Sequence, residues 1–182
     1  MLVSLGIKKN YMRKIAFLGF VVFAVFALSS CLKKDSGCPY TELNVKAPDS
    51  EVQKVEQYLE SKGITALKDS SGVYYIVETA GAGKAPEVCS VISVNYTGTL
   101  TNDQVFDKTD GAPITFRLGE LIPGWQKGLK HIQSGGKIKL FIPPSLGYGN
   151  SDRTRKDENG NDIVVIPANS ILIFSLELIA VQ

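Results

Sequence analysis

Segments of period-two hydrophobicity follow Gly72, and they constrain the fold more than any other feature. Alternating apolar and polar residues put every second side chain on one face, as in a half-buried β-strand. The segments are Val73–Glu78, Val88–Leu100, Ile114–Leu118, Ile138–Ile142 and Leu172–Leu178. One short helix is predicted over Gly124–Gln133, between the third and fourth segments. Its apolar residues Trp125, Leu129 and Ile132 recur about one turn apart. Several strands with a single crossing helix predict an antiparallel α+β sheet.

Another helix is predicted ahead of the strands, over Ser50–Ser61. Its apolar face would consist of Val52, Val55 and Leu59. Asp49 or Ser50 can cap its start, and Gly63 ends it. The helix is short, so we expect an accessory helix packed on the domain rather than a dimerisation arm, and a monomer. The domain itself is predicted over residues 72–182, because about 110 residues suffice for one core.

Residues 1–30 have the make-up of an export signal. Basic residues precede Ile15–Leu28, an uncharged apolar run of 14 residues. Crossing a bilayer takes roughly 20 residues, whereas the core of a signal peptide takes about 7–15. Either Met1 or Met12 fits as the start, since the residues after Met12 alone make a complete signal beginning.

The apolar run ends in Leu28-Ser29-Ser30-Cys31, which resembles the bacterial lipobox. Cleavage before Cys31 would leave a cysteine that carries lipid. We therefore expect a protein anchored by lipid to a membrane of the bacterial cell envelope, periplasmic or surface-exposed. Residues 31–48 would be the tether and residues 49–71 the accessory helix and linker. The alternative is a signal peptide cut nearby, with Cys31 incidental.

Export changes what the two remaining cysteines predict. In an oxidising compartment Cys38 and Cys89 are expected to form a disulfide, with two separate buried thiols as the alternative. The sequence has no CxxC pair, no HExxH and only one histidine, so a zinc site or a Cys–His nucleophile lacks its parts. It also has no phosphate-binding glycine loop. We expect no metal and no cofactor.

The charge of the body excludes nucleic acid as a partner. Without residues 1–30 the chain has 16 basic and 18 acidic residues. A slightly acidic body with no basic block is a poor binder of phosphate backbones.

Aromatic residues beside turn signals indicate a ligand pocket instead. Tyr96 precedes Thr-Gly, Phe106 precedes Asp107, Trp125 follows Pro-Gly, and Tyr148 lies between two glycines. Several such residues favour an apolar cleft with a few polar groups over simple core packing.

These residues belong to motifs that resemble the FKBP-type peptidyl-prolyl cis-trans isomerases, in their bacterial lipoprotein form. In order, the motifs are Val94–Leu100, Val105–Asp107, Ile114–Gly119, Leu121–Trp125, Gly128-Leu129, Lys139–Pro144, Leu146–Gly149 and Ile166–Asn169, followed by the Phe174–Leu178 strand. The similarity covers about Gly72–Gln182. It implies an antiparallel sheet of five to six strands wrapped around one short helix.

The resemblance also implies which residues form the site. The family's pocket falls on Tyr96, Phe106, Asp107, Leu121, Ile122, Trp125, Tyr148, Ile166 and Phe174. Trp125 would form the floor under a proline ring, and the Tyr148 hydroxyl and the Ile122 N–H would bind substrate carbonyls. Ile114 stands where many members have an aromatic wall residue. The segment Asn150–Val165 is longer than in the minimal domain, and its Asn159-Gly160 pair predicts a hairpin turn.

The activity implied is isomerisation of X–Pro bonds in unfolded or exported proteins, with binding of rapamycin-class macrolides as a family property. The alternative is a chaperone or peptide-binding module that retains the fold but turns over slowly.

Overall fold

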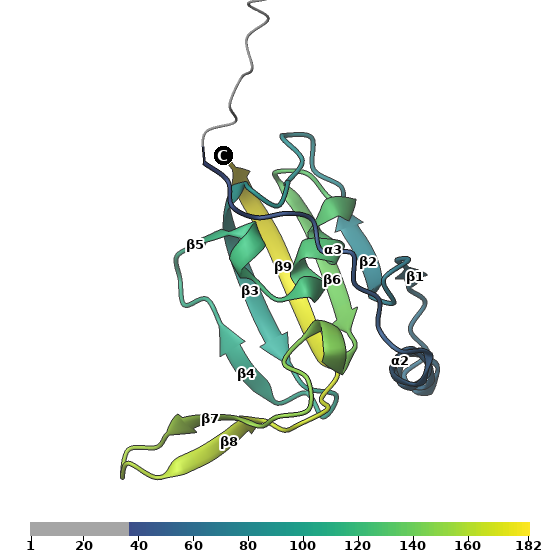
Figure 1. Ribbon diagram of the computed structural model, residues 1–182, viewed down its shortest axis with the longest axis vertical. Helices are drawn as coiled ribbons and strands as arrows, with labels where there is room; N and C mark the ends of the chain where they lie inside the picture. Colours follow the sequence, from purple (N-terminus) through teal and green to yellow (C-terminus); the bar gives the residue numbers. More distant parts are fainter. Residues whose placement is uncertain (1–36) are drawn as a thin grey trace, which may run out of the picture. The chain divides into compact units, whose positions relative to one another are not determined.

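The period-two segments pair as one antiparallel sheet in the computed structural model, which describes residues 37–182 (Figure 1). Within them, Pro39–Gln182 form one compact unit. The strands pair in the order β1-β2-β6-β9-β3-β4, and β5 also pairs with β3. Their bounds are β1 Leu67–Lys68, β2 Tyr74–Thr79, β3 Val91–Thr99, β4 Val105–Lys108, β5 Ile114–Arg117, β6 Gly136–Ile142 and β9 Leu172–Val181. The predicted α+β architecture is confirmed.

Seven strands take part, one or two more than the resemblance implies. The sequence pattern missed β1 and β4, which have two and four residues. Runs this short do not show a period, and β4 is also exposed at three of its four positions. β4 matters because it carries Phe106 and Asp107.

The core lies between the centre of the sheet and the helix. β9 pairs with β6 on one side and β3 on the other. Inward-facing residues of β6 such as Ile138, Leu140 and Ile142 are at most 1% exposed. Burying each of these side chains stabilises the fold by about 1.5–3 kcal/mol.

Two glycines bring the central helix, α3 (Pro123–Gly128), against β6. A Cβ at Gly124 would come within 2.4 Å of Ile142, and one at Gly128 within 2.5 Å of Leu140. Because only glycine permits this approach, the two positions set the height of Trp125 above the sheet. The predicted helix is correct at its start but shorter than expected. It ends at Gly128 and continues as a 3₁₀ turn, η3, over Leu129–His131.

The accessory helix, α2 (Asp49–Ser61), packs on the domain as predicted. Val52, Val55 and Leu59 belong to the buried core cluster, and Gly63 follows the helix with a positive φ of 64°. Neither Asp49 nor Ser50 caps the start. The N-cap is Pro48, whose carbonyl accepts hydrogen bonds from Glu51 and Val52.

The residues before α2 differ from the expected tether. The Tyr40 hydroxyl donates a 2.8 Å hydrogen bond to Glu120, and Ala47 is 2% exposed. Glu42 forms ion pairs with Lys127 and Lys130. We call Tyr40–Ala47 the N-terminal strap, because it is bound to the domain by side chains at both ends.

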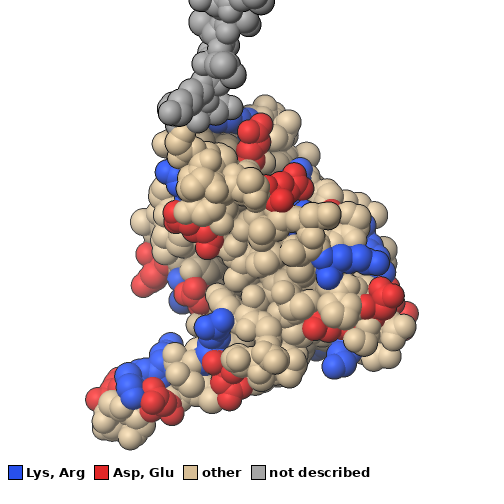
Figure 2. All heavy atoms as spheres, in the orientation of Figure 1, with Lys and Arg blue, Asp and Glu red and all other residues tan. Residues whose placement is uncertain are grey.

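The long segment after Tyr148 forms a separate two-stranded hairpin of β7 (Arg153–Lys156) and β8 (Asp162–Ile166). The predicted turn is confirmed, with Gly160 at a φ of 84° and its N–H bonded to Asp157. The hairpin projects from the rest of the unit (Figure 1), and side chains of both charges lie along it (Figure 2).

Candidate functional site

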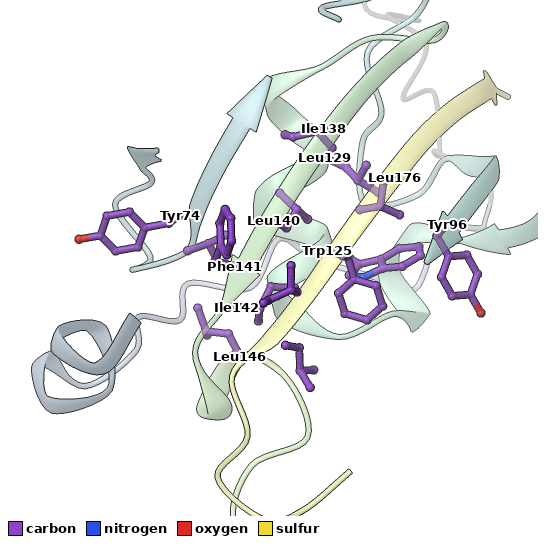
Figure 3. Packing of buried hydrophobic residues seen from close by; sticks show 14 of the residues in the cluster. Tyr74, Tyr96, Trp125, Leu129, Ile138, Leu140, Phe141, Ile142, Leu146 and Leu176 are labelled. Carbon is purple, nitrogen blue, oxygen red and sulfur yellow. The ribbon is translucent and has the colours of Figure 1, made fainter. Parts of the chain in front are cut away.

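The site is built around Trp125, the third residue of α3. Its side chain is 4% exposed and contacts three aromatic rings edge to face, which is a favoured geometry, and the two nearest are those of Tyr96 and Phe174. The ring centroids lie 5.2 Å from Tyr96 on β3 and 5.1 Å from Phe174 on β9. Figure 3 shows Trp125 close to Tyr96 at one end of the buried cluster. Strands and helix therefore hold all three rings rigidly.

A cavity of about 150 Å³ opens over these rings. Its lining residues are Tyr96, Asp107, Phe116, Leu121, Ile122, Trp125, Tyr148 and Phe174. The cavity is apolar and has few polar groups. Trp125, four other aromatic rings and two aliphatic side chains form most of its wall. This composition is usual for a small-molecule or side-chain pocket, and the volume suits one small ring rather than a whole ligand.

The single carboxylate of the pocket, on the exposed residue Asp107, is already bonded. The Tyr96 hydroxyl donates to its Oδ2 at 2.6 Å, and the Lys108 N–H donates to its Oδ1 at 2.9 Å. Burial, and then the hydrogen bond to Asp107, raise the pKa of Tyr96 well above its usual value. At neutral pH Tyr96 is therefore a neutral phenol that donates to the Asp107 side chain.

Three donors of pocket-lining residues are not engaged within the described part of the chain: the buried Trp125 Nε1, the Tyr148 hydroxyl and the Ile122 backbone N–H. The Tyr148 hydroxyl donates no hydrogen bond there, and burial raises its pKa, so it keeps its proton. The guanidinium of Arg153 lies 5.1 Å from the centre of the Tyr148 ring. The backbone N–H of Ile122, just before α3, likewise has no acceptor among residues 37–182. Carbonyl oxygens of a bound peptide can accept from the Tyr148 hydroxyl and from the Ile122 N–H.

A comparison with protein-family models matches residues 83–179 to the FKBP-type peptidyl-prolyl cis-trans isomerases. The chain belongs to this family. The FKBP match spans more than half of the sequence and includes every residue that lines the pocket.

Relatives and solved structures agree with the FKBP assignment. The chain is 43% identical over 129 residues to FkpA of Escherichia coli strain K12, covering 70% of this chain and 43% of that protein. It is 44% identical to FkpA of Buchnera aphidicola subsp. Schizaphis graminum, covering 70% and 47%. The chain thus spans about half the length of these curated relatives. The crystal structure of E. coli FkpA superposes with a TM-score of 0.60 at 34% identity, over 98% of this chain and 74% of that one.

Three residues predicted from the FKBP resemblance lie outside the cavity wall. Phe106 supports it from behind, with its ring 5.4 Å from Phe174 and edge to face. Ile166 is 5% exposed at the end of β8, within the core cluster. Ile114 is 39% exposed at the start of β5. The remaining predicted residues are brought together at the cavity.

Phe116 lines the pocket although the prediction did not include it. Its ring lies 6.3 Å from Trp125 and 6.4 Å from Tyr96. The signal was present, because Phe116 shares the alternating face of β5 with Ile114. In this chain it supplies the aromatic wall that an isoleucine at position 114 does not.

The cysteine predictions have different outcomes. Cys31 lies outside the described residues. Cys38 and Cys89 are each disulfide-bonded in the structure, and their pairing with each other stays a prediction. Residues 37–182 contain no group of three or more potential metal-ligating side chains.

Proposed function

We propose that the protein is a peptidyl-prolyl cis–trans isomerase that acts on X–Pro bonds of exported proteins. The observation that carries the proposal is the pocket itself: a rigid aromatic floor at Trp125 with two unengaged donors, the Tyr148 hydroxyl and the Ile122 N–H, at its edge.

The reaction needs no nucleophile. The barrier to rotation is mainly amide resonance, roughly 18–20 kcal/mol, and the uncatalysed step takes tens to hundreds of seconds. The planar amide separates charge, which water stabilises and an apolar pocket does not. Twisting removes that separation, so a pocket that excludes water lowers the twisted state relative to the planar one.

The polar groups then have positioning tasks. Tyr148 and Ile122 would hold the carbonyl oxygens that flank the proline while its ring lies on Trp125. Asp107 fixes the Tyr96 ring through the 2.6 Å hydrogen bond rather than transferring a proton, because rotation moves none. Activity is therefore expected to be nearly flat across neutral pH, unlike acid–base catalysis.

The test is catalysed isomerisation of a peptide with an apolar residue before proline. We expect the full chain to accelerate it, a rapamycin-class macrolide to inhibit, and Phe106→Ala to lower kcat/KM about 10-fold or more. Lys156→Ala, on exposed β7, is the matched control. A folded wild-type protein that leaves the peptide at its uncatalysed rate rejects the enzyme.

A chaperone or peptide-binding module of low activity is the second candidate. It is supported by exposed apolar side chains on the projecting hairpin, Ile163 at 36% and Val164 at 49%. This second candidate would be favoured if the protein suppresses aggregation of unfolded clients and has no measurable isomerase activity. The enzyme would be favoured if Phe106→Ala loses both isomerase activity and suppression of aggregation.

We further propose that the mature protein is lipid-anchored at Cys31 in a bacterial cell envelope. The support is the apolar run that ends at the lipobox-like Leu28–Cys31. Within the described residues no helix is long and apolar enough to cross a membrane. Cys31→Ala is expected to move the protein from the membrane to the soluble fraction, and a native mass without acyl groups would contradict the anchor.

A Cys38–Cys89 disulfide completes the proposal. It would close a loop of about 50 residues and stabilise the fold by a few kcal/mol at most in the chain-entropy model. Non-reducing peptide mapping should recover the two cysteines in one linked peptide pair. Two free thiols after aerobic purification would disprove it.

A further inference from the structure

Gln126 is a buried polar residue that the pocket prediction does not use. It follows Trp125 in α3 and is 6% exposed. Its side-chain Nε2 donates to the carbonyl oxygen of Leu121 at 2.8 Å and lies 3.4 Å from that of Gly119. Both carbonyls belong to the turn that leads into α3. A glutamine is rarely buried this far without a structural or functional reason.

The turn depends on this side chain for its last hydrogen bonds. Backbone bonds fix its beginning, with Leu118 N–H donating to Ser90 and Gly119 N–H to Val88. Within residues 37–182 no backbone N–H donates to the carbonyls of Gly119 or Leu121. The Gln126 amide therefore satisfies two acceptors that the backbone leaves open.

The same turn delivers two pocket residues. Leu121 contributes a side chain to the cavity wall, and Ile122 contributes a side chain and the unengaged N–H. Because Gln126 lies on the helix that carries Trp125, its amide ties the donor side of the pocket to its floor. The amide adds to the backbone hydrogen bonds by which the Trp125 and Gln126 N–H groups hold the Ile122 carbonyl, and it fixes the Leu121 side of the turn.

We propose that Gln126 is a positioning residue for catalysis, which holds the Leu121–Ile122 turn at the right height over Trp125. The inference rests on the proposed isomerase function. The chemistry calls for an amide: its NH₂ group has two N–H donors, matching two carbonyl acceptors. Methionine has a similar length and no donor. An ionised glutamate at this position has no donor and would face the two carbonyl oxygens with acceptors only. A protonated glutamic acid can donate one hydrogen bond to them.

The experiment compares wild type, Gln126→Met and Gln126→Glu in the peptide isomerisation assay from pH 7.5 to pH 5. We expect kcat/KM of Gln126→Met to fall about 3- to 10-fold at every pH, the loss of about one hydrogen bond. Gln126→Glu should be at least as impaired at pH 7.5 and recover toward wild type at pH 5. Recovery reports a restored donor, which a loss of stability alone does not produce.

Charged side chains lie near the carboxyl group that Gln126→Glu would introduce. Gln126 also lines a separate cavity of about 380 Å³ with Glu42, Glu87, Lys127 and Lys130. The matched controls are Gln57→Met and Gln57→Glu on the exposed face of α2, which are expected to keep wild-type kcat/KM and a flat pH profile.

Three outcomes are decisive. Thermal unfolding first establishes that all variants are folded at the assay temperature. If Gln126→Met does not fold, the comparison of kcat/KM of Gln126→Glu between pH 7.5 and pH 5 tests the inference by itself. An active wild type with both Gln126 variants unimpaired overturns the inference and leaves the isomerase standing. An inactive, folded wild type overturns the isomerase and the inference with it. Impaired variants with acid recovery only at position 126 support the inference.

Discussion

The Tyr96 hydroxyl lies 2.6 Å from Oδ2 of Asp107, and this bond gives the two tyrosines of the pocket different tasks. Tyr96 is committed to the protein, whereas the Tyr148 hydroxyl has no partner within the described residues. Burial of Tyr96 and its bond to the carboxylate both oppose ionisation of the phenol, which raises its pKa. The first tyrosine therefore affects stability and the second affects ligand binding.

The alkaline pH dependence of stability tests the first task. Tyr96 has a pKa of about 10 in the unfolded chain and a higher one in the folded protein. The contribution of Tyr96 to the free energy of unfolding is thus complete below pH 10 and is lost as pH rises above that value. Tyr96→Phe should make the decline in unfolding free energy above pH 10 shallower, by at most about 1.4 kcal/mol per pH unit. Urea unfolding between pH 9 and pH 11 measures it, and an unchanged slope would contradict the assignment.

Tyr148→Phe tests the second task. It removes a hydroxyl that no described residue uses, so kcat/KM toward a prolyl peptide should fall about 3- to 10-fold while the melting temperature changes little. Tyr96→Phe is the matched comparison, because it removes the hydroxyl that donates to Oδ2 of Asp107 and should lower stability as well. A Tyr148 variant with unchanged kcat/KM would show that its hydroxyl does not hold the substrate.

Much of this arrangement could be predicted from the sequence, because it depends on local pattern. Alternation located β3, β6 and β9, and the Trp125, Leu129 and Ile132 spacing located the helix within a few residues. The pocket could be assigned only through family motifs. Its residues come from β3, β4, β5, α3, β9 and the segments before α3 and before β7, and they meet through long-range pairing.

What the sequence did not show has physical causes. β4 is too short for a period, and the N-terminal strap has a polar composition typical of a linker although Tyr40 and Glu42 bind the domain. Nothing local in the sequence indicates that α3 buries Gln126. The FKBP resemblance pointed to position 114 for the wall, whereas Phe116, two residues later on the same face of β5, lines the cavity.

Gly98→Ala tests how closely the pocket wall is packed. A Cβ at Gly98 would lie 2.6 Å from the Phe106 ring and 2.8 Å from the Phe174 ring, so both rings must shift. We expect a loss of about 1–3 kcal/mol in unfolding free energy and a lower kcat/KM. Thr97→Ala, a neighbour on the other face of β3, is the control for kcat/KM. Retained activity and stability in Gly98→Ala would show that the two rings are not tightly constrained.

Asp69→Asn tests the contact between Asp69 and His131, which joins the β1–β2 loop to η3. Asp69 accepts hydrogen bonds from the N–H and hydroxyl of Ser71, and its Oδ2 lies 3.1 Å from Nε2 of His131, whose ring stacks on Tyr75 at 3.9 Å. Burial raises the pKa of Asp69, but the Ser71 donors and His131 outweigh it, so the folded-state pKa is lowered. The stabilisation is therefore complete above the unfolded-state pKa, near 4, and is lost as pH falls through the lower folded-state value.

Asp69→Asn should lower the free energy of unfolding by about 1–3 kcal/mol at pH 7 and flatten its decline below pH 4, measured by urea unfolding. Asp110→Asn, on an exposed loop, should change unfolding free energy by no more than about 0.5 kcal/mol at pH 7, and an equal loss in both variants would rule out a specific role for Asp69.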